Sequence, residues 1–242
     1  MLDTDTVREA GLATRPFDSL LVEAVRFHGH QCPGQVLGVR MVLAGCRAIG
    51  VDQPRKAGKD LVVFVEIDRC ATDAIQALTG VSLGKRTLKH LDYGKMAATF
   101  ANVRSGHAVR VAAREAARER AWEWAPLAVS AREAQILGYR YMPEHDLLAL
   151  DPVRINPGWL DRRRVRVRCA VCAEGINYER EVSVDGRPLC RSCSGHSYYA
   201  PLLGGGGGAE RGVVLGRRGG RESAARASRV YGRPSAESAN ED

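Results

Sequence analysis

Hydrophobic positions recur at helical spacing in two consecutive segments near the start of the chain. The first predicted helix runs from about Asp18 to His28, where Gly29 would end it. The second is predicted to begin at Pro33, because the missing N–H of proline costs nothing at the first helical position, and to end near Gly50. Their apolar faces would be formed by Leu20, Leu21, Ala24, Val25 and Phe27, and by Val36, Val39, Leu43 and Cys46.

Strand-like runs follow in the middle of the chain. Residues 61–67, LVVFVEI, predict a buried strand, and residues 98–104 and 107–113 predict two more, joined by a turn at Ser105-Gly106. A helix is predicted from Asp73 to Leu78, with Asp73 and Gln76 at the spacing of a capping box. Residues 79–95, rich in glycine and lysine, are predicted to form a surface loop. Further helices are predicted at 112–124 and 131–137.

Composition divides the chain into three predicted parts: a core domain at residues 1–155, a small cysteine-bearing domain at 156–203 and a tail at 204–242. The tail is rich in arginine, glycine and serine, which cannot build a core, so we expect it to be disordered. The 242 residues, 45% of them hydrophobic, suffice for one core with a small satellite domain.

The chain shows no sign of export or membrane insertion. It contains no run of about 18 apolar residues, and residues 1–18 lack the apolar core of a secretory signal. We therefore expect a cytoplasmic location, with the seven cysteines kept as thiols for metal binding. The net charge of +8 favours acidic partners such as nucleic acid, although much of this excess is arginine in the C-terminal third.

Two CxxC pairs, Cys169/Cys172 and Cys190/Cys193, are separated by 17 residues, a spacing typical of four-cysteine zinc sites. An Asp185-Gly186 turn between strand-like residues matches a zinc ribbon. Four thiolates would close the tetrahedral shell, so we expect a structural zinc site. The preceding arginines, Arg162, Arg163 and Arg164, favour nucleic-acid binding by the ribbon, but interleaved aromatic residues are absent there.

A second cluster lies in FHGHQCPG, residues 27–34. Cys32 would sit at the start of the helix that Pro33 begins, and Cys70 would sit before the helix at Asp73; both positions favour thiolate over thiol. If both helices start at the same edge of the sheet, Cys32, Cys70 and one of His28 or His30 could form a mixed nitrogen/sulfur site for zinc or another divalent transition metal. Asp73 could orient a ligand or a water molecule.

Alternatives remain for these residues. Cys32 could be a buried small hydrophobic residue, as we expect for Cys46 on an apolar helical face. His28 and His30 could make structural hydrogen bonds, and a Cys–His nucleophile pair would also suit the motif. Residues 80–86, GVSLGKR, do not match the P-loop pattern. Three rather than four residues separate the two glycines, and arginine rather than serine or threonine follows the lysine.

Together, FHGHQCPGQVLGVRM, EIDRCATDAIQALTGVSLGKRTLKHLDYGKMAATF and the late four-cysteine motif resemble the FmdE family of formylmethanofuran dehydrogenase proteins over residues 17–195. The resemblance implies an α+β core with a mixed sheet and packed helices, plus a C-terminal zinc ribbon. It also implies a core metal site, which by motif position involves His28, His30, Cys32 and Cys70, with Asp73 beside it. Lys85, Asp92 and Lys95 match motif positions to which we assign no role.

Two functions follow from these observations. The first is a zinc-binding protein that serves a molybdenum or tungsten oxidoreductase of one-carbon metabolism as an accessory factor, or is itself a metal-dependent enzyme. The resemblance suggests a homodimer and contacts with oxidoreductase subunits. The second is a nucleic-acid-binding or regulatory protein that acts through the basic ribbon.

Overall fold

The structure, a computed structural model, describes residues 11–160 and 165–200. These residues fall into two compact units, of which the first ends at Leu160 and the second contains residues 165–200. The domain limits expected at residues 155 and 203 stay predictions, and the expected disordered tail at 204–242 lies outside the described residues. None of the described helices is long and apolar enough to cross a membrane.

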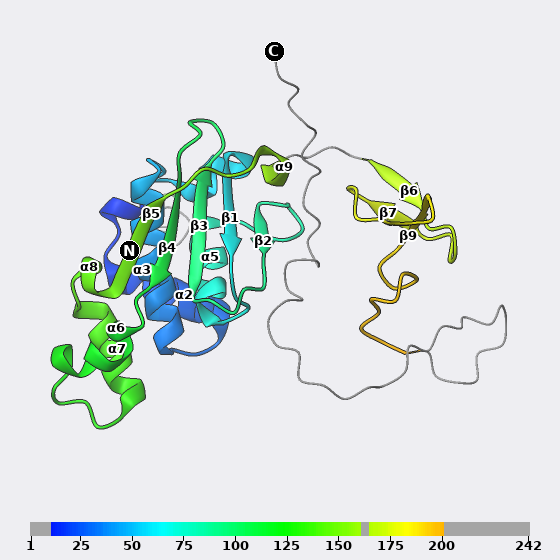
Figure 1. The fold of residues 1–242 in the computed structure, drawn as a ribbon. Helices are drawn as coiled ribbons and strands as arrows, with labels where there is room; N and C mark the ends of the chain where they lie inside the picture. Colours follow the sequence, from blue (N-terminus) through cyan, green and yellow to red (C-terminus); the bar gives the residue numbers. More distant parts are fainter. Residues whose placement is uncertain (1–10, 161–164, 201–242) are drawn as a thin grey trace, which may run out of the picture. The chain divides into compact units, whose positions relative to one another are not determined.

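The first unit alternates helices and strands around one hydrophobic core (Figure 1). Its helices of more than five residues are α2 (Phe17–His28), α3 (Pro33–Ala48), α5 (Cys70–Thr79) and α7 (Ala131–Tyr141). Its strands are β1 (Leu61–Val65), β2 (Leu88–His90), β3 (Ala97–Asn102), β4 (Ala108–Ala113) and β5 (Leu148–Pro152). Its short helical turns are η1 (Leu12–Thr14), α4 (Pro54–Ala57), η2 (Gly58–Asp60), α6 (Ala116–Arg120), η3 (Ala121–Trp124), α8 (Glu144–Leu147) and α9 (Pro157–Leu160).

The five strands form one mixed sheet in the order β2-β1-β3-β4-β5. β1 runs parallel to β2, and the other neighbouring pairs are antiparallel. All five residues of β1 are buried, as an apolar run in an interior strand of a covered sheet requires. The helices α2, α3 and α5 lie together behind the sheet in Figure 1, so the predicted α+β fold with a mixed sheet and packed helices is confirmed.

The first two predicted helices are confirmed at nearly their predicted limits. Gly29, with φ of 98°, ends α2 in the left-handed conformation, which glycine adopts without strain. Pro33 occupies the first turn of α3 after Cys32, which adopts the extended conformation of an N-cap residue. Phe27 was expected on the apolar face of α2, but its side chain is 58% exposed, so that part of the prediction is wrong.

Two strands were missed by the sequence patterns. β2 lies inside the segment predicted to be a surface loop, and β5 lies in a segment for which the sequence patterns predicted no strand. Both are edge strands that are held by pairing with a neighbour: Val63 N–H of β1 donates to Thr87 O at 2.8 Å, and β5 pairs with all of β4 except its first residue. Such pairing is a tertiary property, which a local pattern of three to five residues does not reveal.

The second unit contains two short antiparallel hairpins, β6 (Arg166–Arg168) with β7 (Gly175–Asn177) and β8 (Val182–Val184) with β9 (Arg187–Leu189). The predicted turn at Asp185 and Gly186 is present, and both residues have positive φ, as a tight hairpin turn requires. The buried residues of this unit are Cys169, Ile176 and Leu189. Such a small core cannot stabilise a fold of this size without a further cross-link.

Candidate metal centres

The starts of α3 and α5 meet at the end of α2. His28 is the last residue of α2, Cys32 is the N-cap of α3 and Cys70 is the first residue of α5. One nitrogen of His28 and the two sulfur atoms all lie within 4.8 Å of one another, a spacing that could hold a metal ion. We call these three residues the core site. Cys32 is buried, whereas His28 and Cys70 are partly exposed.

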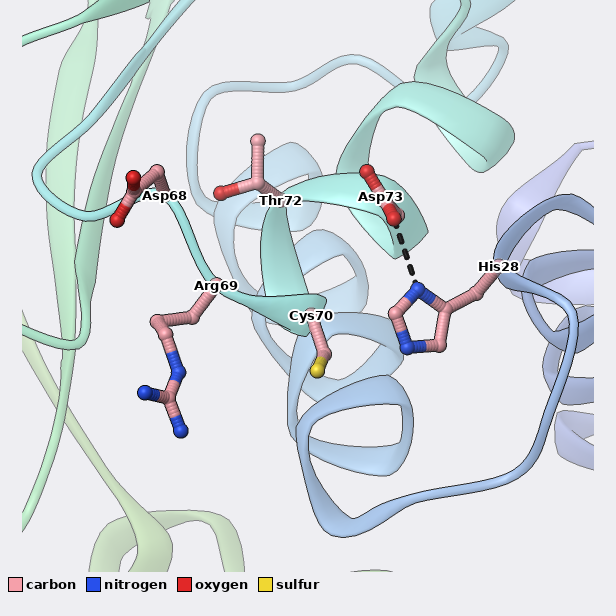
Figure 2. A pocket seen from close by; sticks show the side chains of 6 residues that line it. All are labelled: His28, Asp68, Arg69, Cys70, Thr72 and Asp73. Carbon is pink, nitrogen blue, oxygen red and sulfur yellow. Dashed lines mark hydrogen bonds and ion pairs between the residues drawn. The ribbon is translucent and has the colours of Figure 1, made fainter.

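The orientation of the His28 ring is fixed by Asp73 of α5. Nδ1 of His28 lies 2.8 Å from Oδ2 of Asp73 (Figure 2). A carboxylate accepts this hydrogen bond, so Nδ1 carries the proton; in the neutral imidazole, Nε2 then keeps a free lone pair. Nε2 is buried and has no hydrogen-bond partner among the described residues. A histidine held by a carboxylate through one nitrogen, with the other nitrogen available, has the arrangement of a metal ligand.

His30 lies next to the core site but outside the group of three. Its ring centroid is 4.6 Å from that of His28, with the planes tilted by 39°, and its side chain is exposed. Gly29, in the left-handed conformation, separates His28 from His30, and Arg132 of α7 donates a hydrogen bond to the Gln31 carbonyl at 2.8 Å. Direct metal binding by His30 therefore stays a prediction.

Two glycines of α3 allow its start to approach α5 closely. A Cβ atom at Gly34 would lie 2.8 Å from Cys70 Cβ, and one at Gly38 would lie 2.7 Å from Ala71 O. The side chain of Gln35, which is fully buried, donates a hydrogen bond to the Cys70 carbonyl at 2.5 Å. These contacts between helix starts bring Cys32 and Cys70 together.

The capping box predicted at Asp73 is wrong. α5 begins three residues earlier, at Cys70, with Arg69 in the extended N-cap conformation. Thr72 supports this start because its hydroxyl donates to Ile67 O at 3.0 Å. Asp73 instead bonds to His28 of another helix, a partner that local spacing could not reveal.

At Cys70 the effect expected from the helix start is outweighed by its surroundings. Burial raises the pKa of Cys70, and the hydrogen bond and charge of the neighbouring Cys32 raise it further. The backbone N–H of Cys70 and the charge of Arg69 lower the pKa, but by less. Two adjacent sulfur atoms therefore resist double ionisation, and a divalent cation between them would compensate the second negative charge.

A pocket of about 340 Å³ opens beside the core site (Figure 2). It is lined by His28, Asp68, Arg69, Cys70, Thr72 and Asp73. Two of the three candidate ligands thus face a space that a small molecule could enter. Sequence reasoning missed Arg69, because its importance depends on this pocket rather than on a motif.

The four cysteines of the second unit also converge, with their sulfur atoms within 4.8 Å of one another. Backbone N–H groups point at them: Cys190 N lies 3.3 Å from Cys169 Sγ, and Cys193 N lies 3.4 Å from Cys190 Sγ. Backbone hydrogen bonding, led by that of Cys172, lowers the pKa of Cys169 to about 6. Burial and the other three sulfur atoms raise the pKa of Cys193 to about 12. Four crowded thiols that cannot all ionise alone suit a divalent cation.

The remaining candidates lie outside both groups of metal-binding residues. Lys85 Nζ donates to the Gly80 carbonyl at 3.1 Å and so closes its own turn. The N–H groups of Tyr93 and Lys95 donate to Glu66 O, which places the DYGK segment against the end of β1. The same end of β1 leads to Arg69 and Cys70.

The basic residues that favoured nucleic-acid binding are described only in part. Arg162, Arg163 and Arg164 lie outside the described residues. Arg166 and Arg168 are exposed on β6. Nucleic-acid binding therefore stays a prediction.

The fold and these two sites define a mixed α/β protein with two groups of residues that could hold a metal ion. The chain belongs to the FmdE family: the family model described as "FmdE, Molybdenum formylmethanofuran dehydrogenase operon" matches residues 27–147, half of the chain. The resemblance noted in the sequence is thus confirmed.

Among the known proteins that resemble this chain are one similar in sequence and one similar in structure. A protein of Archaeoglobus fulgidus named "Probable S-adenosyl-L-methionine-binding protein" is 42% identical over 94 residues, which are 38% of this chain and 26% of that protein. The match therefore spans only about a quarter of that relative. The crystal structure of a tungsten formylmethanofuran dehydrogenase FmdE-like protein from Syntrophus aciditrophicus has a TM-score of 0.54 and 23% identity, covering 79% of this chain and 99% of that one. This similarity supports the fold.

Proposed function

We propose that His28, Cys32 and Cys70 bind zinc or another divalent transition metal and leave one coordination position open to the pocket. The observation that carries the proposal is the His28 ring: Asp73 holds Nδ1 at 2.8 Å, while the buried Nε2 has no partner among the described residues. A buried nitrogen without a partner costs free energy, and a cation near the two sulfur atoms would remove that cost.

The residues present fit such an ion. One nitrogen and two sulfur ligands suit zinc, and three protein ligands with a fourth position open are typical of catalytic rather than structural zinc sites. When bound, the metal would supply Lewis acidity or lower the pKa of a bound water molecule. The protein would contribute the fixed His28 tautomer through Asp73, the close approach of α3 and α5, and access for a small molecule through the pocket.

The four cysteines of the second unit have a different proposed role. Four thiolates would complete a tetrahedral zinc site and leave no position for a substrate. Because the buried core of this unit is small, a bound ion would supply the stability that the core lacks. We therefore assign to Cys169, Cys172, Cys190 and Cys193 a structural zinc site.

The wider setting is proposed from the family. An accessory role in a molybdenum or tungsten formylmethanofuran dehydrogenase system, with contacts to its subunits, follows from the family description and the similar solved structure. A metal-dependent enzyme of one-carbon metabolism is the other role, and the open three-ligand geometry with its pocket favours it. A cytoplasmic location and a homodimer belong to the same proposal.

Metal content per chain tests the two sites separately. Zinc measured by mass spectrometry should amount to about two ions per full-length chain. One ion would occupy the four-cysteine site, and the other would occupy the core site with its open coordination position. Cys32→Ser and His28→Gln should each lose one ion and keep the circular dichroism of the folded core. Cys169→Ser combined with Cys172→Ser should lose the other ion. Cys46→Ala is the matched control, because Cys46 is buried on α3 away from both groups, and it should keep both ions.

Unchanged metal content in both Cys32→Ser and His28→Gln would remove the core site from the account. The structural zinc site would survive that result, since its ligands are in the other unit.

A further inference from the structure

Arg69 forms no ion pair, whereas seven other arginines among the described residues of the first unit do. Ion pairs with aspartate or glutamate are formed by Arg15, Arg47, Arg55, Arg104, Arg110, Arg120 and Arg140. Among the described residues no carboxylate forms an ion pair with Arg69, although its side chain is exposed and Asp68 precedes it directly. An unpaired guanidinium on the wall of a pocket is available for a ligand.

The other polar groups of the pocket do not compete for this guanidinium. Figure 2 shows the Arg69 side chain extending on the same side of the loop as the Cys70 sulfur, with His28 beyond that sulfur. The Asp68 carboxylate points away from Cys70 in the same view. Asp73 is occupied by His28, and the Thr72 hydroxyl is occupied by Ile67 O.

The pocket is therefore lined by a histidine with one nitrogen that has no partner, by a cysteine and by an arginine that forms no ion pair among the described residues. The planar fork of arginine matches the two oxygens of a carboxylate, which it can bind through two parallel hydrogen bonds. A pocket of about 340 Å³ admits a small organic molecule.

We propose that Arg69 binds the carboxylate of a small organic acid and places it beside the core metal. This inference rests on the proposed function, because the metal occupies the other side of the same pocket. Arg69 is a binding residue for the ligand and is not a metal ligand. Phosphate has related oxyanion chemistry, so the test separates it from a carboxylate.

Relaxation of ligand protons by Co²⁺ provides a readout that needs no known reaction. The full-length chain is loaded with Co²⁺, or with diamagnetic Zn²⁺ as the reference, and the methyl protons of acetate are followed by NMR. The metal count is measured first on the same samples. We expect acetate to be relaxed by the Co²⁺ protein and much less by Cys32→Ser, which keeps only the metal of the four-cysteine site.

Arg69→Gln should raise the apparent dissociation constant of acetate about tenfold, the scale of a lost charged hydrogen bond at a partly exposed site. Arg69→Lys should give an intermediate value, since it keeps the charge and loses the fork. Arg104→Gln is the matched control: Arg104 is exposed and pairs with Asp60, so acetate binding should change less than about twofold.

Three results would overturn the inference: unchanged acetate binding in Arg69→Gln, equal relaxation of neutral acetamide, or tighter binding of phosphate than of acetate in competition. These results are distinguishable from failure of the proposed function. In that case the wild-type chain would take up no more cobalt than Cys32→Ser, and the carboxylate site would fall with the metal site.

Discussion

Replacement of Gly38 by alanine should separate the two helix starts that form the core site. A Cβ atom at this position would lie 2.7 Å from both Ala71 O and Ala74 Cβ, and 3.0 Å from Ala71 Cα. Two of these atoms belong to the backbone, and Ala74 has no rotamer to change. Because ordinary contacts begin at 3.4 Å, α3 and α5 would have to move apart by about 0.7 Å.

The expected cost has two parts. Overpacking at a tight contact lowers the free energy of unfolding by about 1–3 kcal/mol. The higher helix propensity of alanine raises it by about 1 kcal/mol, so the net loss should be about 1–2 kcal/mol. Metal–ligand distances tolerate only about 0.2 Å of deviation, so displacement of Cys70 relative to Cys32 should weaken metal binding at the core site at least about tenfold.

Competition with a chromophoric chelator measures the affinity, with the four-cysteine site of the same chain as internal reference, and urea denaturation measures the stability. Gly45→Ala is the matched control on the same helix, because its Cβ would overlap the Phe100 ring of β3 instead of α5. It should destabilise the fold while core-site affinity changes less than about threefold. Wild-type metal affinity in Gly38→Ala would refute the reasoning that this helix contact sets the site.

Three further predictions follow from named contacts. Asp73→Asn should weaken metal binding at the core site about 10–100-fold in chelator competition, because His28 loses its carboxylate partner; equal affinity would contradict that role. Metal removal should unfold the second unit, seen as rapid proteolysis between residues 165 and 200, while the circular dichroism of the first unit persists; resistance of the stripped unit would contradict a structural ion. Arg110→Met should cost about 2–3 kcal/mol in urea denaturation, because Glu66 is buried and loses both hydrogen bonds at 2.7 Å, whereas the exposed Arg104→Gln should cost less than about 1 kcal/mol; similar costs would contradict the burial argument.

The proximity of Cys32 and Cys70 could be anticipated from the sequence because both residues lie at helix starts. Pro33 and Gly29 mark the start of α3 and the end of α2, and the two cysteines were expected to converge if both helices start at the same edge of the sheet. The helix at Cys70 was predicted to begin three residues too late. Asp73 has the sequence spacing of a helix cap, but its carboxylate bonds to His28 instead. The sequence could not decide between His28 and His30, because Gly29, with φ of 98°, interrupts the regular backbone between them.

Other features could not be read from local patterns. β2 and β5 owe their strand conformation to pairing with β1 and β4, and their sequences carry little strand signal of their own. The four-cysteine group was predictable because two CxxC turns at zinc-ribbon spacing fix its geometry almost alone. Arg69 became important only when the pocket and the lack of an ion-pair partner were known.

X-ray absorption at the zinc edge tests the central claim most directly, on the Cys169→Ser/Cys172→Ser chain loaded with one equivalent of zinc. The account predicts a mixed shell with two sulfur atoms at about 2.3 Å and nitrogen or oxygen atoms at about 2.0–2.1 Å, with the sulfur contribution halved by Cys32→Ser. A shell of nitrogen and oxygen alone, or one that Cys32→Ser leaves unchanged, would contradict it.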